Sequence, residues 1–217
     1  MSFTVTVPAA DRALLTLDEI KGALGISGTD QDVALANFGL QISDIISDEC
    51  RVPGDGIAIP TLLRETIVQT ERIVRCDGNA KPASLILVRR FIGAISSITV
   101  DGTALEASDY EIDRGAGLLR RLCGSSFVDW PQGTTVVSYT AGFVEIPGAL
   151  KRAAVTVLRE QASADSRDPS LKSLRQKTDG LSETEWGYWV NSAAGGTSSA
   201  ISGPASAMLD PYRYWTV

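Results

Sequence analysis

The sequence feature that most constrains the fold is a change of period within residues 134–158. Residues 134–140 alternate between two faces, as a β-strand does. Gly142 can then adopt backbone angles that other residues avoid, and Pro147 suits the first turn of a helix. An apolar stripe at helical spacing follows, made of Leu150, Ala153, Ala154, Val157, Leu158 and Ala162. Since the chain before this point looks mostly helical and then mostly strand-like, we expect a β region inserted into a helical one.

A capped helix is predicted near the start of the chain. Residues 1–13 are rich in Thr and Val, which favours an extended lead. Thr16 and Glu19 have the spacing of a capping box, in which each side chain accepts a hydrogen bond from the backbone of the other. We therefore expect a short helix over residues 17–24, ended by Gly25 or Gly28.

Two further helices are predicted before residue 83. Thr29 and Asp32 repeat the capping pattern ahead of an apolar stripe that runs to about Cys50. Pro60 predicts the start of a third helix, whose apolar residues would be Leu63, Ile67, Val68 and Val74. Residues 1–83 are thus predicted to be the N-terminal part of a helical bundle.

Residues 84–143 are predicted to be the β insertion, an antiparallel meander with short turns. Asp101 and Gly102 form a hairpin turn signal. The candidate strands lie at residues 85–88, 95–100, around 110–112, around 118–119 and at 134–140. The fold class expected is therefore α+β, a small helical bundle with an inserted β-meander and an extended C-terminal tail.

The remainder of the chain is predicted to return to the bundle and then leave it. Residues 144–190 would hold the closing helix, from about Gly148 to Ala164, and a short helical extension over residues 170–177. Residues 191–217 would be a tail, because residues 191–207 are nearly all Gly, Ser and Ala and cannot bury enough apolar surface to fold.

Composition narrows the function classes. The chain has 217 residues, 44% of them hydrophobic, and a net charge of −6. A protein that wraps nucleic acid through its phosphates needs a basic face, so if this protein meets DNA, we expect it not to bind it tightly. No apolar run approaches the roughly 18 residues of a membrane span, and no secretion signal is apparent at the start. The three cysteines are far apart and are expected to be reduced thiols.

The sequence does not indicate a catalytic, metal or cofactor site. The chain has no histidine, so the common Ser–His and Cys–His nucleophile pairs are ruled out. Asp109, Glu111 and Asp113 alternate and could share one face of a strand, where they would bind a cation or simply face solvent. The paired cations, Arg89 with Arg90 and Arg120 with Arg121, could meet phosphate, an acidic neighbouring subunit or solvent.

The C-terminal tail is unusual in its aromatic content. Tyr212, Tyr214 and Trp215 follow the Gly- and Ser-rich stretch. Exposed aromatic side chains on a free tail would be a liability. Either the tail folds back on its own domain, or it docks into a groove on another subunit, since aromatic residues and Arg contribute most to interface energies.

Several segments, taken in order, resemble the head–tail connector (adaptor, or head-completion) proteins of tailed bacteriophages and gene transfer agents. The N-terminal segments LTLDEIKGALGI and TDQDVALANFGLQISDIISDE are similar to that family. Three later segments are also similar to it: ISSITVDGTALEASDYEIDRGAGLLRRL, VSYTAGF and IPGALKRAAVTVL. Trp130 and Gly133, which lie between the first two of these, are part of the resemblance. The chain departs from the family at Asp168 and Pro169, which break the closing helix early, and in its long linker.

The resemblance implies a structural protein of the virion and no enzyme. In that family, twelve copies form a ring beneath the portal vertex, which extends the DNA channel and docks the next neck, stopper or tail protein. The protein would be made in the cytoplasm of a bacterial host and located at the head–tail junction. The resemblance also implies that the tail binds the portal, through Leu209, Tyr212, Arg213, Tyr214 and Trp215.

Two alternatives remain at this point. The chain could be another neck or tail subunit, such as a tail terminator or baseplate protein, and a hexamer or trimer would favour that. It could also be a cation-dependent enzyme that uses the Asp109, Glu111 and Asp113 row, although nothing else in the sequence supports this.

Overall fold

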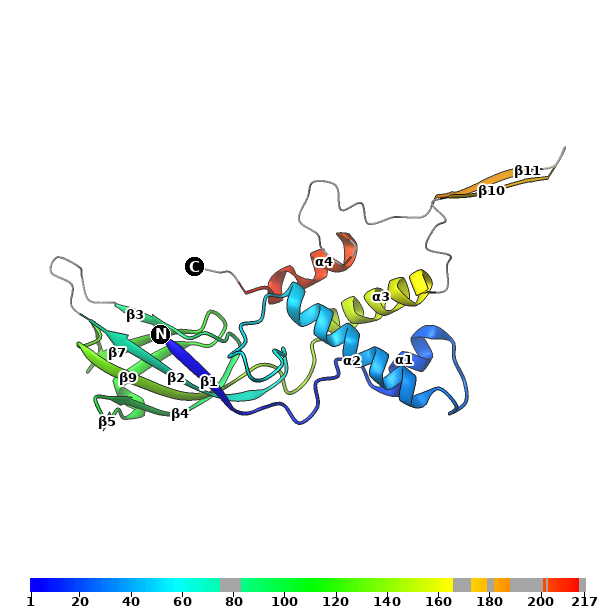
Figure 1. The fold of residues 1–217 in the computed structure, drawn as a ribbon. Helices are drawn as coiled ribbons and strands as arrows, with labels where there is room; N and C mark the ends of the chain where they lie inside the picture. Colours follow the sequence, from blue (N-terminus) through cyan, green and yellow to red (C-terminus); the bar gives the residue numbers. More distant parts are fainter. Residues whose placement is uncertain (75–82, 166–172, 179–181, 188–200, 202, 215–217) are drawn as a thin grey trace. The chain divides into compact units, whose positions relative to one another are not determined.

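The computed structural model describes residues 1–74, 83–165, 173–178, 182–187, 201 and 203–214, and it has the mixed α+β fold that the sequence predicts (Figure 1). The chain forms two compact units. The β unit comprises residues 1–13, 50–147 and 212–217, and the helical unit comprises residues 14–49 and 148–211. Residues 50–147 thus separate the two stretches of the helical unit, and residues 50–83, predicted to belong to the helical bundle, lie in the β unit.

Two antiparallel sheets build the β unit. The first has the strand order β1-β2-β9-β4-β5, and the second has the order β3-β7-β6, with β8 paired to β7. Their bounds are β1 Ser2–Val7, β2 Glu65–Ile73, β3 Ser84–Ile86, β4 Ile92–Val100, β5 Thr103–Ala104, β6 Tyr110–Asp113, β7 Leu118–Cys123, β8 Ser126–Val128 and β9 Gly133–Ala141, with the 3₁₀ turn η1 at Ala107–Asp109.

The third predicted helix is wrong, because its residues form strand β2. The apolar residues Leu63 and Ile67 are four positions apart, which imitates a helical stripe. In the structure every second residue from Glu65 to Gln69 is buried, and the strand pairs with β9 along its whole length. Two residues on the inward face of β2, Glu65 and Gln69, are polar. The apolar residues of this segment therefore do not alternate in the way that indicates a strand.

The predicted meander is also wrong in its strand order. Strand β9 comes last in the β region but lies between β2 and β4, so it pairs on both sides. The two sheets enclose one core, whose buried members are Ile67, Ile73, Leu85, Leu87, Ile92, Ile98, Leu119, Trp130, Val137, Tyr139 and Ala141. A central strand that is hydrogen-bonded on both edges gives this core a rigid wall.

Two predicted turns are confirmed. Asp101 and Gly102 both have positive φ, 46° and 81°, and connect β4 to β5 as the hairpin signal predicts. Gly142, with φ of 94°, ends β9 where a Cβ atom would lie 2.2 Å from the carbonyl oxygen of Leu63. Only glycine fits at this position, because the neighbouring backbone leaves no room for a side chain.

The helical unit contains α1 (Leu17–Leu24), α2 (Asp32–Glu49), α3 (Gly148–Asp165) and α4 (Gly203–Leu209). The first three confirm the predicted helices. The capping box of α1 is formed by Thr16 and Glu19, and Gly25 ends the helix in the left-handed conformation. Helices α1 and α2 approach closely, since a Cβ atom on Gly39 would lie 2.5 Å from the side chain of Ile20.

The region after α3 differs from its prediction. Residues expected to extend the helix instead form a hairpin of β10 (Ser173–Thr178) and β11 (Ser182–Gly187). Part of the stretch predicted to be a flexible linker is helix α4, in which Ala205 and Leu209 are buried and which packs on α3. Asp168, Pro169 and most of the predicted linker lie outside the described residues. Among those described, no helix has both the length and the apolar character to cross a membrane.

A single carboxylate fixes the loop before β2. The Asp55 carboxylate accepts hydrogen bonds of 2.9 Å from the backbone N–H groups of Val5, Ile57 and Ala58. These bonds lower the pKa of Asp55 from its ordinary value of 3.8, because they favour the charged form. They attach strand β1 to the loop and hold Ile57 outward, with 86% of its side chain exposed.

We expect Thr16→Ala to lower the free energy of unfolding of the helical unit by about 1 kcal/mol, because the first turn of α1 loses its cap. Thr16→Ser retains the hydroxyl oxygen and should stay close to the parent chain. Urea unfolding followed by circular dichroism measures both variants. Equal loss in the two variants would contradict the capping role.

We expect Asp55→Ala to lower the free energy of unfolding at pH 7 by about 1–3 kcal/mol, because three backbone donors lose their acceptor. The native pKa lies below the unfolded one, so this stabilisation is complete above about pH 4 and is lost as the pH falls through the native pKa. The difference between variant and parent should therefore shrink on acidification. Asp30→Ala, at an exposed position, is the control and should change little.

Candidate interaction surfaces

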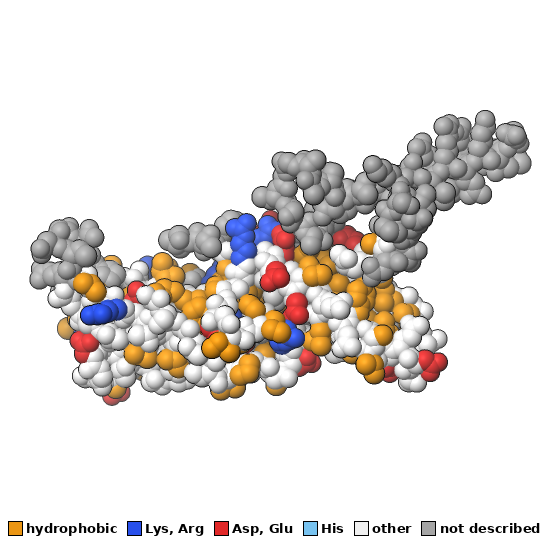
Figure 2. Space-filling model, in the orientation of Figure 1, with side chains coloured by type: hydrophobic (Ala, Val, Ile, Leu, Met, Phe, Trp, Pro, Cys, Tyr) orange, Lys and Arg blue, Asp and Glu red, His pale blue; other side chains and the backbone are white. Residues whose placement is uncertain are grey.

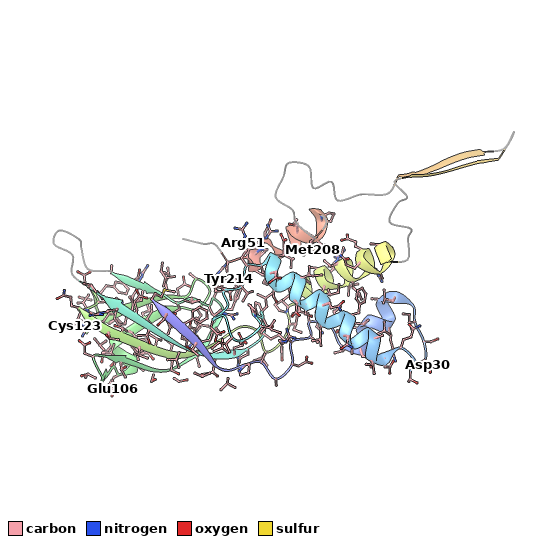
Figure 3. All side chains as sticks on the ribbon, viewed as in Figure 1. Asp30, Arg51, Glu106, Cys123, Met208 and Tyr214 are labelled. Carbon is pink, nitrogen blue, oxygen red and sulfur yellow. The ribbon has the colours of Figure 1, made fainter. Side chains whose placement is uncertain are left out.

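The C-terminal segment lies on the β unit of its own chain. The backbone N–H of Tyr214 donates to the carbonyl of Cys50 at 2.8 Å, and the Tyr214 hydroxyl accepts from the backbone N–H of Arg90 at 3.3 Å. The Arg90 guanidinium donates to the carbonyl of Arg213 at 2.6 Å. Burial raises the pKa of Tyr214, so its hydroxyl stays protonated at neutral pH. Figure 3 labels Tyr214 beside the β unit.

The five residues predicted to bind a portal are placed differently from one another. Leu209 in α4 is fully buried and Tyr214 is 6% exposed. Tyr212 and Arg213 are half-buried, and Trp215 lies outside the described residues. The tail therefore packs on its own chain here, and whether it also docks on a partner stays a prediction.

A buried polar network lies beneath the segment. Arg89 and Glu65, each 3% exposed, form an ion pair of 2.9 Å, and Arg89 also donates to the carbonyl of Thr61 at 2.8 Å. The Tyr139 hydroxyl accepts from the Arg89 backbone at 3.3 Å and donates to Gln69 at 3.2 Å. Burial raises the pKa of Tyr139 and keeps it neutral.

The Glu65 carboxyl is the costly member of this network. Burial raises its pKa, and the neighbouring Arg89 guanidinium opposes that effect only in part. A charge of this kind is stable in the interior only when its partner stays in place. The ion pair therefore fixes Arg89, and the adjacent Arg90 carries the hydrogen bonds to the C-terminal segment.

An aromatic cluster joins this segment to an open groove of about 570 Å³. The rings of Phe91 and Phe143 have centroids 4.6 Å apart, and Tyr212 lies 6.2 Å and 5.8 Å from them. Phe91 has a φ of 59°, which is rare for a bulky residue. Its carbonyl accepts from the N–H of Gly142 at 3.1 Å, so the strained residue is held against the end of β9.

Two arginines and two phenylalanines line this groove. A Cβ atom on Gly93 would lie 3.0 Å from the Arg64 guanidinium, so the absence of a side chain lets that cation lie over the backbone. The Arg114 guanidinium donates to the carbonyl of Gly93. Other lining residues include Ile92, Gly115, Gly142, Val144 and Glu145. We call this surface the arginine groove; its paired guanidinium groups suit a carboxylate, and its rings suit an apolar or aromatic neighbour.

The other residues singled out from the sequence do not form a site. Glu111 and Asp113 lie on exposed positions of β6, whereas Asp109 precedes that strand and accepts a hydrogen bond from the backbone of Glu106. No group of three His, Cys, Asp or Glu among the described residues could hold a metal ion. Arg120 stacks over the Phe127 ring at 5.2 Å.

No disulfide joins the two described cysteines. Cys50 is buried and Cys123 is exposed, while Cys76 lies outside the described residues. On the face seen in Figure 2, basic and acidic side chains are interspersed over the described parts of the chain.

Sequence reasoning missed the arginine groove because its residues come from four separate segments. Phe143 belongs to the YTAGF motif, but nothing in the sequence connects it to Phe91 or Arg64. The structure brings them together because β2, β4 and β9 are adjacent and in register, with Glu65 and Ile92 both paired to Ala141. The positive φ of Phe91 could not be predicted either, because phenylalanine is not a residue type that indicates this backbone conformation.

Comparison with known proteins gives a likeness in fold. The chain is similar to a chain in the neck of an empty gene transfer agent particle computed with C6 symmetry, with a TM-score of 0.55 and 16% identity. It is also similar to a chain in the virion of a native gene transfer agent particle, with a TM-score of 0.55 and 13% identity. Each match covers 100% of this chain and 97% of the other. No family model and no curated protein matches the sequence.

We expect Arg89→Met to lower the free energy of unfolding at pH 7 by about 3–5 kcal/mol, because it leaves the Glu65 carboxylate buried without a partner. The native pKa of Glu65 lies above 4.5, so the cost of the charge exists above that pKa and disappears as the pH falls through it. The loss should thus be smaller near pH 4. Arg89→Met with Glu65→Leu should recover most of the stability in urea unfolding. A double variant as unstable as the single one would contradict this account.

Proposed function

We propose that this chain is a structural subunit of a virion neck and, more specifically, the head–tail connector beneath the portal. The observation that carries the proposal is the likeness in fold along the full length of a gene transfer agent neck chain. A match that covers nearly all of both chains includes the β unit and the helical unit, so a shared single motif does not account for it. The order of the sequence segments that resemble the connector family supports the same assignment independently.

In the proposed role, copies of the chain form a ring of twelve that extends the DNA channel. The C6 symmetry used for the similar neck is compatible with twelve copies, because twelve is a multiple of six. A net charge of −6 suits a channel wall past which DNA slides without being bound. The function is assembly, and many weak contacts in a ring become strong together through effective concentration.

The proposed partners are the portal on one side and the next neck or tail protein on the other. Portal contact is assigned to the C-terminal segment, with Leu209, Tyr212, Arg213, Tyr214 and Trp215. Leu209 and Tyr214 are buried in the isolated chain. They position the segment, and they can contact the portal directly only if docking exposes their side chains. Tyr212 and Arg213 retain exposed surface for direct contact.

A test of the tail must leave α4 in place. Removal of the whole predicted tail, residues 191–217, would also remove α4, which contributes buried Ala205 and Leu209 to the helical unit. A loss of binding would then be ambiguous. A chain that ends at Tyr214, and an Arg213→Glu variant of the full chain, leave α4 intact.

We expect the full chain, mixed with the portal protein encoded in the same genome, to form a complex with twelve copies in electron micrographs. The two variants should bind the portal at least about tenfold more weakly, because central aromatic and Arg residues supply most interface energy. Arg152→Glu, on the exposed surface of α3, is the charge-matched control. A hexamer or trimer that ignores the portal would reassign the chain to another neck or tail position, and normal binding by both variants would remove the tail-anchor assignment.

A further inference from the structure

The two ends of the first sheet carry side chains of opposite charge. At one end, Glu65 of β2 and Ile92 of β4 pair with Ala141 of β9, and the arginine groove lies there. At the other end, Ile73 pairs with Gly133, and the β4–β5 hairpin follows Val100. Since β2 and β9 are each nine residues long, the two ends are roughly 25 Å apart.

The distal hairpin is acidic. Residues 101–109, which we call the acidic hairpin, contain Asp101, Glu106 and Asp109 and no Lys or Arg. Asp101 and Glu106 are exposed, as is Ala104 in β5, which follows the Asp101–Gly102 turn. Figure 3 labels Glu106 at the end of the β unit away from Tyr214. The turn is held in shape because Asp101 also accepts a hydrogen bond of 2.7 Å from the backbone of Thr134.

The arginine groove is complementary to this hairpin. Arg64 and Arg114 are exposed, so their guanidinium groups can meet carboxylates of a partner. The Phe91 and Phe143 rings offer apolar surface to the small residues of the tip. Two residues oppose this complementarity. Glu145 adds a negative charge to the groove lining, and Arg72 adds a positive charge near the distal end of β2.

We infer that the acidic hairpin of one copy docks in the arginine groove of the next copy, and that this contact joins neighbours in the ring. The inference rests on the proposed function. Two different surfaces of the same chain that fit one another make a heterologous contact, which closes into a ring when the rotation between copies allows it. A contact between identical surfaces would give a dimer instead.

Charge reversal tests the contact. Arg64→Glu with Arg114→Glu should raise the protein concentration needed for ring assembly at least about tenfold, because like charges would then face each other. Arg64→Glu alone is compared with Arg72→Glu as the charge-matched control, because each reverses one arginine of or beside β2 and Arg72 lies at the opposite end, where reversal should not weaken assembly. Mass photometry over a series of concentrations and salt levels measures assembly, with thermal unfolding as the check that each variant folds.

Cross-linking tests the same contact by geometry. Ala104→Cys places one thiol on strand β5 of the acidic hairpin, and Val144→Cys places one in the groove. Both are made in a background with Cys76→Ser and Cys123→Ser. The two thiols of one chain are too far apart to bond to each other, so oxidation of rings should give a ladder of linked copies. Either cysteine alone should give no ladder.

The outcomes separate the inference from the proposed function. Rings that form without a ladder, and that tolerate reversal of both arginines, would overturn the hairpin contact and leave the connector assignment standing. Reversal that abolishes binding to duplex DNA while rings persist would assign the groove to phosphate instead and overturn the inference. Failure of the parent chain to assemble, alone or with the portal, would remove both.

Discussion

The structure of the β unit depends on one strand that must satisfy two neighbours. Strand β9 pairs with β2 along its whole length on one side and with β4 from Thr135 to Ala141 on the other. Its alternating inward residues, Val137, Tyr139 and Ala141, are almost fully buried. Gly142 then turns the chain at a point where a Cβ atom would lie only 2.2 Å from the carbonyl oxygen of Leu63. Helix α3 begins six residues later. The turn thus allows the β region to end and the helical region to resume within a few residues.

The end of β9 also positions the aromatic cluster and the buried polar network. The carbonyl of Phe91 accepts from Gly142, and Phe143 stacks on the Phe91 ring, so the aromatic cluster is built directly on the end of β9. Tyr139 points inward from the same strand to the network of Arg89 and Glu65. Because Arg90 follows Arg89, the buried ion pair also positions the donors that hold the C-terminal segment. A surface proposed for partners is therefore supported by interactions inside the β unit.

The buried polar groups of the β unit serve its structure. The buried carboxyl of Glu65 has a raised pKa, yet it pairs with the Arg89 guanidinium and is not among the residues that line the groove. Perturbed groups of this type often mark catalytic sites, but here the ion pair connects elements of the fold. The opposite charges at the two ends of the first sheet are the feature that a ring of copies could use, because assembly requires complementary surfaces on each copy.

The sequence by itself determined the elements whose signals are local. The capping box of Thr16 and Glu19, the Asp101–Gly102 turn and the change of period before α3 each depend on neighbours in the chain, and all three are present. The order of the segments also suggested a virion neck protein, and the fold is similar to that of a chain in a gene transfer agent neck. Only the tertiary structure decided the rest. Residues 65–73 are a strand because β9 pairs with them and buries Glu65 and Gln69, which a pattern of apolar residues cannot anticipate. The arginine groove exists because non-adjacent strands come into register, and long-range pairing leaves no mark on residue spacing.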